Sequence, residues 1–289
     1  MTILTLAQRC AKRLLLTSPS SVVGSTDNNI ILLQAMIELA AEEIRDSFEW
    51  PELQKEHTFT LATNTASYAL PADYNSTVNE SLWNRDQNWE LIGPLSPQEW
   101  QLYKSGLISD IPRQRFRIKG WGTNQFFIDP TPSSSENGQT CAYEYMSRTC
   151  FRPKTWAAST SWTGMRYCSY NGYIFDRGGT GAATTGSDNA PTPSDLTDGS
   201  ITWTLYSSSF ETINHDNDEC ILDNKMIVDG AVWRFKRERG LDYEGLRRDA
   251  EAQIEISKVK LQGSETLSIQ GGSGYPIIGF HNYPTDDYL

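Results

Sequence analysis

The sequence predicts an α+β protein: an α-helical bundle formed by N- and C-terminal helices, with a central antiparallel β domain and an inserted small β-rich module. Three observations lead to this fold class. Apolar residues recur at steps of three and four between residues 25 and 53, which is the spacing of one buried helical face. Between residues 57 and 150 they alternate with polar residues, as in strands with one buried face. The helical spacing returns after residue 214, and the simplest assembly packs the helices of both chain ends together.

Two helices are predicted at the start of the chain. Residues 2 to 16 have apolar side chains at helical spacing, with Thr2 as the capping residue. Residues 25 to 53 form a longer amphipathic pattern, and we expect this helix to end near Trp50 because Pro51 cannot continue the hydrogen-bond ladder. A helical hairpin of this size is too small to be stable alone, so it needs a packing partner from elsewhere in the chain.

The stretch from residue 57 to 150 predicts short antiparallel strands with one helix among them. Residues 83 to 92 suggest one hairpin, and residues 116 to 128 suggest another. Between them, Ser96 and Pro97 fit the cap and the first position of a short helix, with Glu99 in its acidic first turn. We expect the strands to form a small sheet that is closed or packed as a sandwich.

Residues 151 to 210 differ from the rest of the chain in composition. Ser, Thr and Gly dominate, with aromatic residues between them, which indicates a compact β module inserted into the chain. Exposed aromatic rings can stack on sugar rings, so Trp162, Tyr170 and Tyr173 are candidate glycan contacts. The favoured interpretation of the tryptophans is nevertheless the hydrophobic core, because a module this small needs large apolar side chains to form one.

Two further helices are predicted near the end of the chain, at residues 221 to 235 and 243 to 261. The first is expected to stop at Gly240 after a basic last turn. The acidic stretch at residues 214 to 219 precedes it and has the composition of a metal-binding loop. It lacks the central glycine and the distal glutamate of a calcium loop, so capping of the following helix is the favoured interpretation.

The predicted organisation has five segments. They are residues 1–56 and 211–262, the two parts of the helical bundle; 57–150, the antiparallel β domain; 151–210, the inserted module; and 263–289, an extended docking arm. The arm combines glycine and proline with apolar side chains, which favours ordering against another subunit or protein over packing on its own domain. The expected partner-contacting residues of the arm are Tyr275, Ile277, Ile278, Phe280, Tyr283 and Tyr288.

Charge and motif content limit the chemistry of the chain. The formal net charge of −11 argues against nonspecific binding to nucleic acid. The five cysteines are scattered without a Cys-x-x-Cys pair, so buried reduced thiols are favoured over disulfides or a zinc site. The three histidines lack ligand spacing, and no phosphate-binding glycine loop or nucleophile elbow occurs. We therefore predict no catalytic residue, cofactor or metal, and we expect a soluble protein with no membrane partner.

Several short motifs follow one another in order along the chain. They include Trp50-Pro-Glu-Leu, Tyr68-Ala-Leu-Pro-Ala-Asp-Tyr74, Gly93-Pro-Leu-Ser-Pro-Gln-Glu-Trp100, Phe127-Ile-Asp-Pro-Thr-Pro132 and Tyr143-Glu-Tyr145. This ordered series resembles the head-to-tail adaptor proteins of tailed bacteriophages, in particular the tail tubular protein A type of short-tailed phages. The resemblance covers about residues 1 to 150 and 217 to 261. The segment near 156 to 206 departs from this pattern and is similar to small β modules of phage tail and sugar-binding proteins.

The resemblance implies a structural virion protein of the neck or tail, assembled in the host cytoplasm. Such adaptors form a ring of twelve subunits between the portal protein and the tail nozzle protein, and DNA passes through the channel without specific binding. An acidic chain agrees with this role, because an acidic ring repels the DNA backbone. One alternative is a tail-associated carbohydrate-binding protein that contacts a receptor or capsule through the inserted module. A polysaccharide-degrading enzyme is a less favoured alternative.

Overall fold

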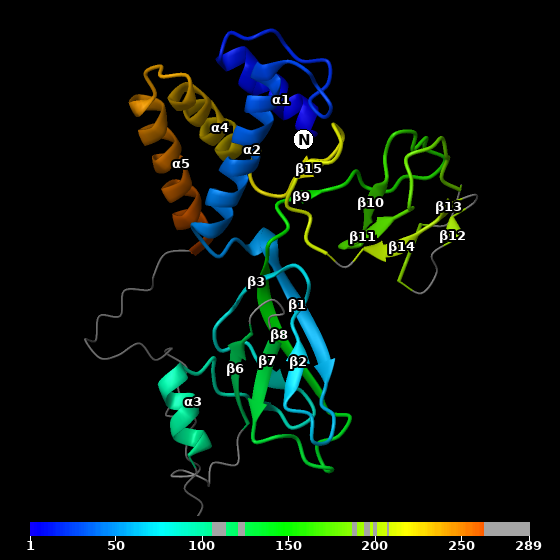
Figure 1. Cartoon of the computed structure of the whole chain (residues 1–289), viewed down its shortest axis with the longest axis vertical. Helices are drawn as coiled ribbons and strands as arrows, with labels where there is room; N and C mark the ends of the chain where they lie inside the picture. Colours follow the sequence, from blue (N-terminus) through cyan, green and yellow to red (C-terminus); the bar gives the residue numbers. More distant parts are fainter. Residues whose placement is uncertain are drawn as a thin grey trace, which may run out of the picture.

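The computed structural model describes residues 1–105, 114–120, 125–186, 190–193, 197–198, 201–206 and 208–262. Figure 1 shows a group of helices at one end of the long axis and a β part at the other end, with a smaller β part to one side. The described residues contain five α-helices and several sheets whose strands pair antiparallel. The predicted α+β class is confirmed.

The chain opens with α1 (Ile3–Arg13) and α2 (Asn28–Asp46). The side chain of Thr2 accepts a hydrogen bond from the amide of Thr5, so Thr2 caps α1 as predicted. The cap of α2 is Asp27, whose carboxylate accepts from the second amide of the helix. Both helices therefore start where a side-chain oxygen satisfies an amide that has no partner within the helix.

The end of α2 differs from the prediction. The helix stops at Asp46 and not near Trp50. The hydroxyl of Ser47 donates to the carbonyl of Ile44, and the chain then turns so that the buried indole of Trp50 donates to the same carbonyl at 2.6 Å. Two side chains thus satisfy the helix end before the chain reaches the proline, where the short turn η1 (Pro51–Leu53) begins.

The helices of the second half pack onto those of the first. α4 (Asn224–Glu238) contacts α1, α2 and α5 (Glu244–Gln262), and it ends before Gly240, which has a φ of +66°. The helices α1 and α2 therefore form one helical part with α4 and α5 (Figure 1), with a shared apolar core. Ion pairs join the helices: Arg13 with Asp229 between α1 and α4, and Glu43 with Arg234 between α2 and α4.

α2 and α4 approach each other closely at Gly230. A Cβ atom at this position would lie 3.1 Å from the Cβ of Ala40 and 2.9 Å from Nη1 of Arg234. Arg234 is only 4% exposed, and its guanidinium donates to the carbonyl of Gly230 at 2.8 Å. The buried guanidinium occupies the space beside the glycine, so the absence of a side chain at position 230 sets the distance between the two helices.

Two antiparallel sheets between α2 and the insert form what we call the β domain. The larger sheet contains β1 (Gln54–Thr60), β3 (Tyr74–Thr77), β4 (Trp83–Asn84), β5 (Trp89–Glu90) and β8 (Thr140–Ser147). The smaller sheet contains β2 (Ser67–Ala69), β6 (Arg115–Lys119) and β7 (Gln125–Asp129). Phe126 of β7 and Tyr143 of β8 belong to one core, with ring centroids 6.0 Å apart. The sheets thus pack face to face, which agrees with the sandwich rather than the closed form.

The local predictions for this part are confirmed. β4 pairs with β5, with Trp83 opposite Glu90, and β6 pairs with β7, with Ile118 opposite Phe126. The helix between these hairpins is α3 (Pro97–Lys104). Its start is the predicted cap, in which the side chains of Ser96 and Glu99 each accept a hydrogen bond from the other residue's amide.

The inserted module has a base strand pair and a core of its own. β9 (Phe151–Arg152) pairs with β15 (Glu219–Cys220), so the chain enters and leaves the module at one place. Trp162, Trp203 and Phe175 are fully buried in the core, as the favoured interpretation of the tryptophans expects. The strands of the module are β10 (Tyr167–Tyr170), β11 (Tyr173–Asp176), β12 (Thr197–Asp198), β13 (Ile201–Thr202) and β14 (Thr204–Tyr206).

All five cysteines are buried and free, as predicted. Burial raises the pKa of the Cys10 and Cys220 thiols to about 12, so these groups are neutral at physiological pH. They act as small apolar side chains in the core of the helical part. The boundaries of the five predicted segments stay predictions, although the described residues do have three separate apolar cores.

Candidate functional site

The acidic loop before α4 joins distant segments and does not cap the helix that follows it, which corrects the prediction. β15 lies between the loop and α4, and the cap of α4 is Asp223, whose carboxylate accepts from the amide of Lys225. The loop instead caps α1, because the carbonyl of Asp218 accepts from the amide of Ile3 at 2.7 Å. Local sequence could not show this, since α1 lies more than two hundred positions away.

The side chains of the same loop are also satisfied by protein groups. The carboxylate of Asp216 accepts from the amides of Val22 and Val23, each at 2.9 Å. The carboxylate of Asp218 accepts from the amides of Asn214 and His215. Within the part of the chain that the structure describes, no group of three or more His, Cys, Asp or Glu side chains is arranged to hold a metal ion. The loop is a structural link between α1, the segment that connects α1 to α2, and the base of the insert.

The three candidate glycan contacts lie in different environments. Trp162 has no exposed surface and is part of the module core, so its ring is not available to a ligand, and its assignment as a glycan contact is corrected. Tyr170 is partly buried and packs against Trp156, with ring centroids 5.8 Å apart. Tyr173 is 48% exposed at the start of β11. The structure therefore leaves Tyr170 and Tyr173 on the surface that a partner can reach.

Those two tyrosines line a groove between the insert and the β domain. Two adjoining depressions share Glu52, Lys55, Thr149 and the turn at residues 171–174, so they form one continuous groove, which we call the module groove. Sequence reasoning identified two of its residues and missed the rest. The main lining side chains are Lys55, His57, Pro71 and Ala72 from the β domain, and Tyr170, Tyr173, Ile174, Leu205 and Tyr206 from the insert.

A buried carboxylate fixes the β-domain wall of the groove. Asp73 is 7% exposed and accepts hydrogen bonds from Lys55 Nζ at 2.7 Å, from the Tyr145 hydroxyl at 2.8 Å and from the Ser147 hydroxyl at 2.6 Å. Burial opposes the ionisation of Asp73, but the hydrogen bonds from Lys55 and Ser147 outweigh it, and the pKa of the carboxyl lies below its ordinary value. The carboxylate is therefore ionised at neutral pH and holds β1, β8 and the turn before β3 together.

The insert wall of the groove combines an anchored side chain with exposed ones. The ring of Tyr206 lies 5.1 Å from that of Tyr167 and 6.2 Å from that of Phe210, which belongs to the core of the helical part. Leu205, its neighbour in β14, is 46% exposed, and Tyr173 in the paired strand β11 is similarly open to solvent. Exposed apolar side chains on an ordered sheet are the usual features of a binding surface.

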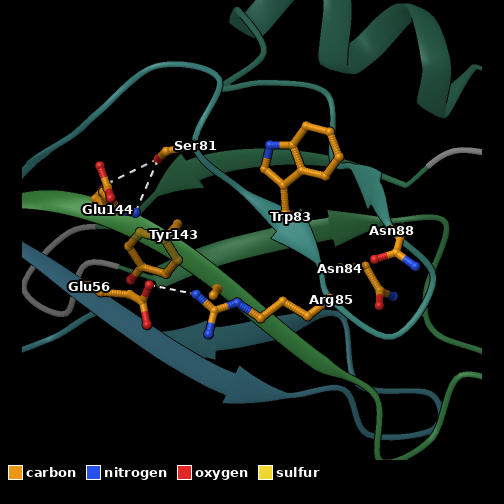
Figure 2. A pocket seen from close by; sticks show the side chains of 9 residues that line it. Glu56, Ser81, Trp83, Asn84, Arg85, Asn88, Tyr143 and Glu144 are labelled. Carbon is orange, nitrogen blue, oxygen red and sulfur yellow. Dashed lines mark hydrogen bonds and ion pairs between the residues drawn. The ribbon is translucent and has the colours of Figure 1, made fainter.

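A second depression lies on the outer face of the larger sheet of the β domain (Figure 2). Trp83 is 45% exposed on β4, and its indole donates to the carbonyl of Glu80 at 3.2 Å. The small side chain of Ala142 leaves space beside the indole. Arg85 and Glu56, which form an ion pair with an N–O distance of 2.5 Å, border that space. An exposed indole among charged side chains has the composition of a protein contact site. This depression is a second candidate surface for subunit contact.

Comparison with known protein families finds a match to the SU10 adaptor protein over residues 1–255. The chain belongs to the SU10 adaptor family. The matched range includes the inserted module, which the resemblance of the separate motifs left out. A comparison with curated proteins finds no match.

Membership of the SU10 adaptor family makes the chain a phage adaptor, a structural component of the virion that associates with other head or tail proteins. The predicted phage adaptor class is thereby confirmed at the level of the family. None of the described helices of this SU10 adaptor is long and apolar enough to cross a membrane.

The predicted partner-contacting arm of the adaptor lies outside the described residues. The side chains in question are Tyr275, Ile277, Ile278, Phe280, Tyr283 and Tyr288. Their role stays a prediction. The residues that sequence reasoning missed share one property: Lys55, Leu205 and Trp83 are ordinary strand positions, and only the assembled fold places them beside a depression.

Proposed function

We propose that this SU10 adaptor forms a ring, of twelve subunits, between the portal protein and the tail nozzle protein, with DNA passing through its channel. The family match over residues 1–255 carries the proposal, because it identifies a phage adaptor. The tail tubular protein A type is the form that we propose for it. The role is structural, with no catalytic residue and no cofactor.

The arrangement of the chain supports different roles for the helical part and the β domain within such a ring. The β domain projects from the helical part (Figure 1). We assign the contacts between neighbouring subunits to the helical part and the contact with the next tail component to the β domain. α5 carries exposed apolar side chains that suit burial against a neighbour. They are Ile256, Val259 and Leu261.

The charge of the chain supports passage of DNA without binding. The formal net charge is −11 per chain, so a ring of such chains is strongly acidic. Nonspecific binding to DNA needs clustered Lys and Arg side chains that displace counterions from the phosphates. An acidic channel repels the phosphates, and DNA slides through it.

The test is assembly on purified portal protein. Sedimentation velocity of the adaptor alone is expected to show monomers, and addition of portal is expected to produce a larger complex that contains a closed ring of adaptor subunits. Portal that gains no adaptor at micromolar concentrations of both proteins would contradict the proposal. The arm at residues 275–289 is the proposed contact with portal or with a neighbouring subunit.

A second candidate is a contact with a receptor or capsule glycan through the insert. The observation in its favour is the exposed ring of Tyr173 in a groove that also holds Tyr170. Titration of purified adaptor with host polysaccharide fragments, followed by calorimetry, tests it. Binding that Tyr173→Ala removes and Leu241→Ala retains would support this function, since Leu241 is an exposed apolar residue after α4. Release of fragments would indicate the less favoured enzymatic role.

A further inference from the structure

The module groove has mostly apolar walls that are held in place by hydrogen bonds. None of the described residues fills it. Its β-domain wall is held by the carboxylate of Asp73, and its insert wall by the pairing of β11 with β14. Two side chains on the insert wall, Tyr173 and Leu205, remain about half exposed. An ordered groove with exposed apolar walls gains free energy when an apolar partner covers it.

The chain itself contains a segment with the chemistry that fits this groove. Residues 275–289 contain two Tyr-Pro pairs, at Tyr275 and at Tyr283, with isoleucine and phenylalanine side chains between them. Proline fixes φ near the value of an extended left-handed helix, so such a segment loses little conformational freedom when it binds. Proline-containing extended segments are recognised by aromatic-lined grooves, and the module groove presents Tyr170, Tyr173 and Tyr206.

We propose that the module groove is the docking site for residues 275–289 of this protein, which bind there as an extended peptide. The inference deepens the proposed function and rests on it, because it gives the docking arm a receptor site on the adaptor itself. Apolar contacts supply most of the affinity. Lys55 and Arg152 line the same groove as Glu52, so charge adds little, and docking depends weakly on salt.

A linker separates α5 from the Tyr-Pro pairs. α5 ends at Gln262, and twelve residues, 263–274, precede the first Tyr-Pro pair. Twelve extended residues span at most about 40 Å. The stretch includes Gly271-Gly-Ser-Gly274, a composition typical of linkers. We assign the segment to a neighbouring copy of the chain, in agreement with the proposed contact of the arm with a neighbouring subunit.

The test uses the full-length protein, with and without portal protein, with p-benzoylphenylalanine in place of Tyr283. After irradiation, mass spectrometry is expected to find the cross-link in peptides that contain β11, β14 or residues 52–57. In an equal mixture of light and heavy isotope-labelled chains, mixed products identify a neighbouring copy as the donor and unmixed products identify the same chain. Mixed products support docking between neighbouring copies, and groove cross-links found only in unmixed products would overturn it. Cross-links confined to other surfaces, or no cross-link, would overturn the proposal.

Variants of exposed groove residues sharpen the test. Tyr173→Ala and Leu205→Ala are expected to lower the yield of the groove cross-link about tenfold each, while Leu241→Ala, a matched exposed apolar position outside the groove, leaves it unchanged. Unchanged yield in both groove variants would overturn the inference. A host saccharide that binds in a Tyr173-dependent manner, with no groove cross-link in its absence, would assign the groove to a glycan and also overturn it.

The two proposals fail separately in these measurements. Ring assembly on portal with no groove cross-link would overturn this inference and leave the proposed function intact. A groove cross-link with no assembly on portal would overturn the proposed function and leave the docking site intact.

Discussion

The carboxyl group of Asp218 is buried within the acidic loop before α4. Asp218 is 3% exposed, and its carboxylate accepts from the amides of Asn214 and His215 at 2.9 and 2.8 Å. Burial raises the pKa of this carboxyl to about 6, although the two hydrogen bonds oppose the rise. A folded-state pKa above the ordinary value means that ionisation at neutral pH disfavours the folded state.

Asp218→Asn is therefore expected to stabilise the protein at neutral pH. In the wild type, the contribution of this group to the free energy of unfolding is fully present below pH 3.8, the ordinary pKa of an aspartate. It is lost as the pH rises to about 6, the pKa in the folded state. Asparagine keeps an acceptor oxygen for both amides and carries no charge. The variant is expected to gain about 2 kcal/mol in the free energy of unfolding at pH 7 and to lose this pH dependence. Urea denaturation at pH 4, 5, 6 and 7 measures both effects.

The neighbouring Asp216 supplies a control of opposite sign. Burial alone would raise the pKa of its carboxyl. The hydrogen bonds from the amides of Val23 and Val22 outweigh burial, so the pKa lies below its ordinary value. Ionised Asp216 therefore stabilises the folded state above its unfolded pKa, and Asp216→Asn is expected to lose stability at pH 7. The same direction of change in both variants would contradict this account of the loop.

Two aromatic residues of the insert are expected to differ sharply in their effect on stability. Trp162 is fully buried and packs edge to face on Trp203, with ring centroids 5.8 Å apart, so Trp162→Ala is expected to cost about 4 kcal/mol. Tyr173 is half exposed, and Tyr173→Ala is expected to change stability by less than about 0.5 kcal/mol. Chemical denaturation of both variants checks this. Equal stability of the two would mean that Trp162 is not a core residue.

At the scale of elements, the close contact of α2 with α4 depends on Gly230. A methyl group there would lie within 3.1 Å of both Arg234 and Ala40, so Gly230→Ala is expected to destabilise the protein by about 2 kcal/mol. A Cβ atom at Gly245 in α5 would meet no other atom within 4 Å, so Gly245→Ala is the matched control and is expected to be neutral or stabilising. Thermal melting compares them. A destabilised control with an unaffected Gly230 variant would contradict this packing of α2 on α4.

Elements whose signals are local were predictable from the sequence. The capping box of α3 needs only Ser96 and Glu99, and the pairing of β6 with β7 needs only the alternation of apolar and polar residues in two neighbouring segments. The end of α2 was not predictable, because the buried indole of Trp50 turns back onto the carbonyl of Ile44. The acidic loop was misassigned for a similar reason, since its hydrogen-bond partners in α1 lie at the other end of the chain.

The candidate site was predictable only in part. Composition identified Tyr170 and Tyr173 as aromatic residues of a small module. It also favoured the core for the tryptophans, which the burial of Trp162 confirms, but it could not show that Tyr173 faces the β domain across a groove. The opposite wall, with Lys55, comes from a strand more than a hundred positions earlier, and no local periodicity relates the two.

At the scale of the whole molecule, the described elements end with α5 at Gln262, and the proposed docking arm follows. Deleting residues 271–289 is expected to leave the melting temperature of the monomer unchanged, because none of the three described apolar cores includes this segment. The same deletion is expected to abolish the joining of heads to tails. Melting curves and an in vitro assay that joins purified heads to tails measure the two effects. Truncated protein that still yields infectious particles would show that the arm is not the joining element.

We propose that this chain forms the collar between portal and tail nozzle, with its helical part making the ring. Cryo-electron microscopy of the intact phage neck tests it most directly. The account predicts a closed ring of density directly below the portal that fits this fold, with the helices of both chain ends packed together. Density at that position that fits a different polypeptide would contradict it.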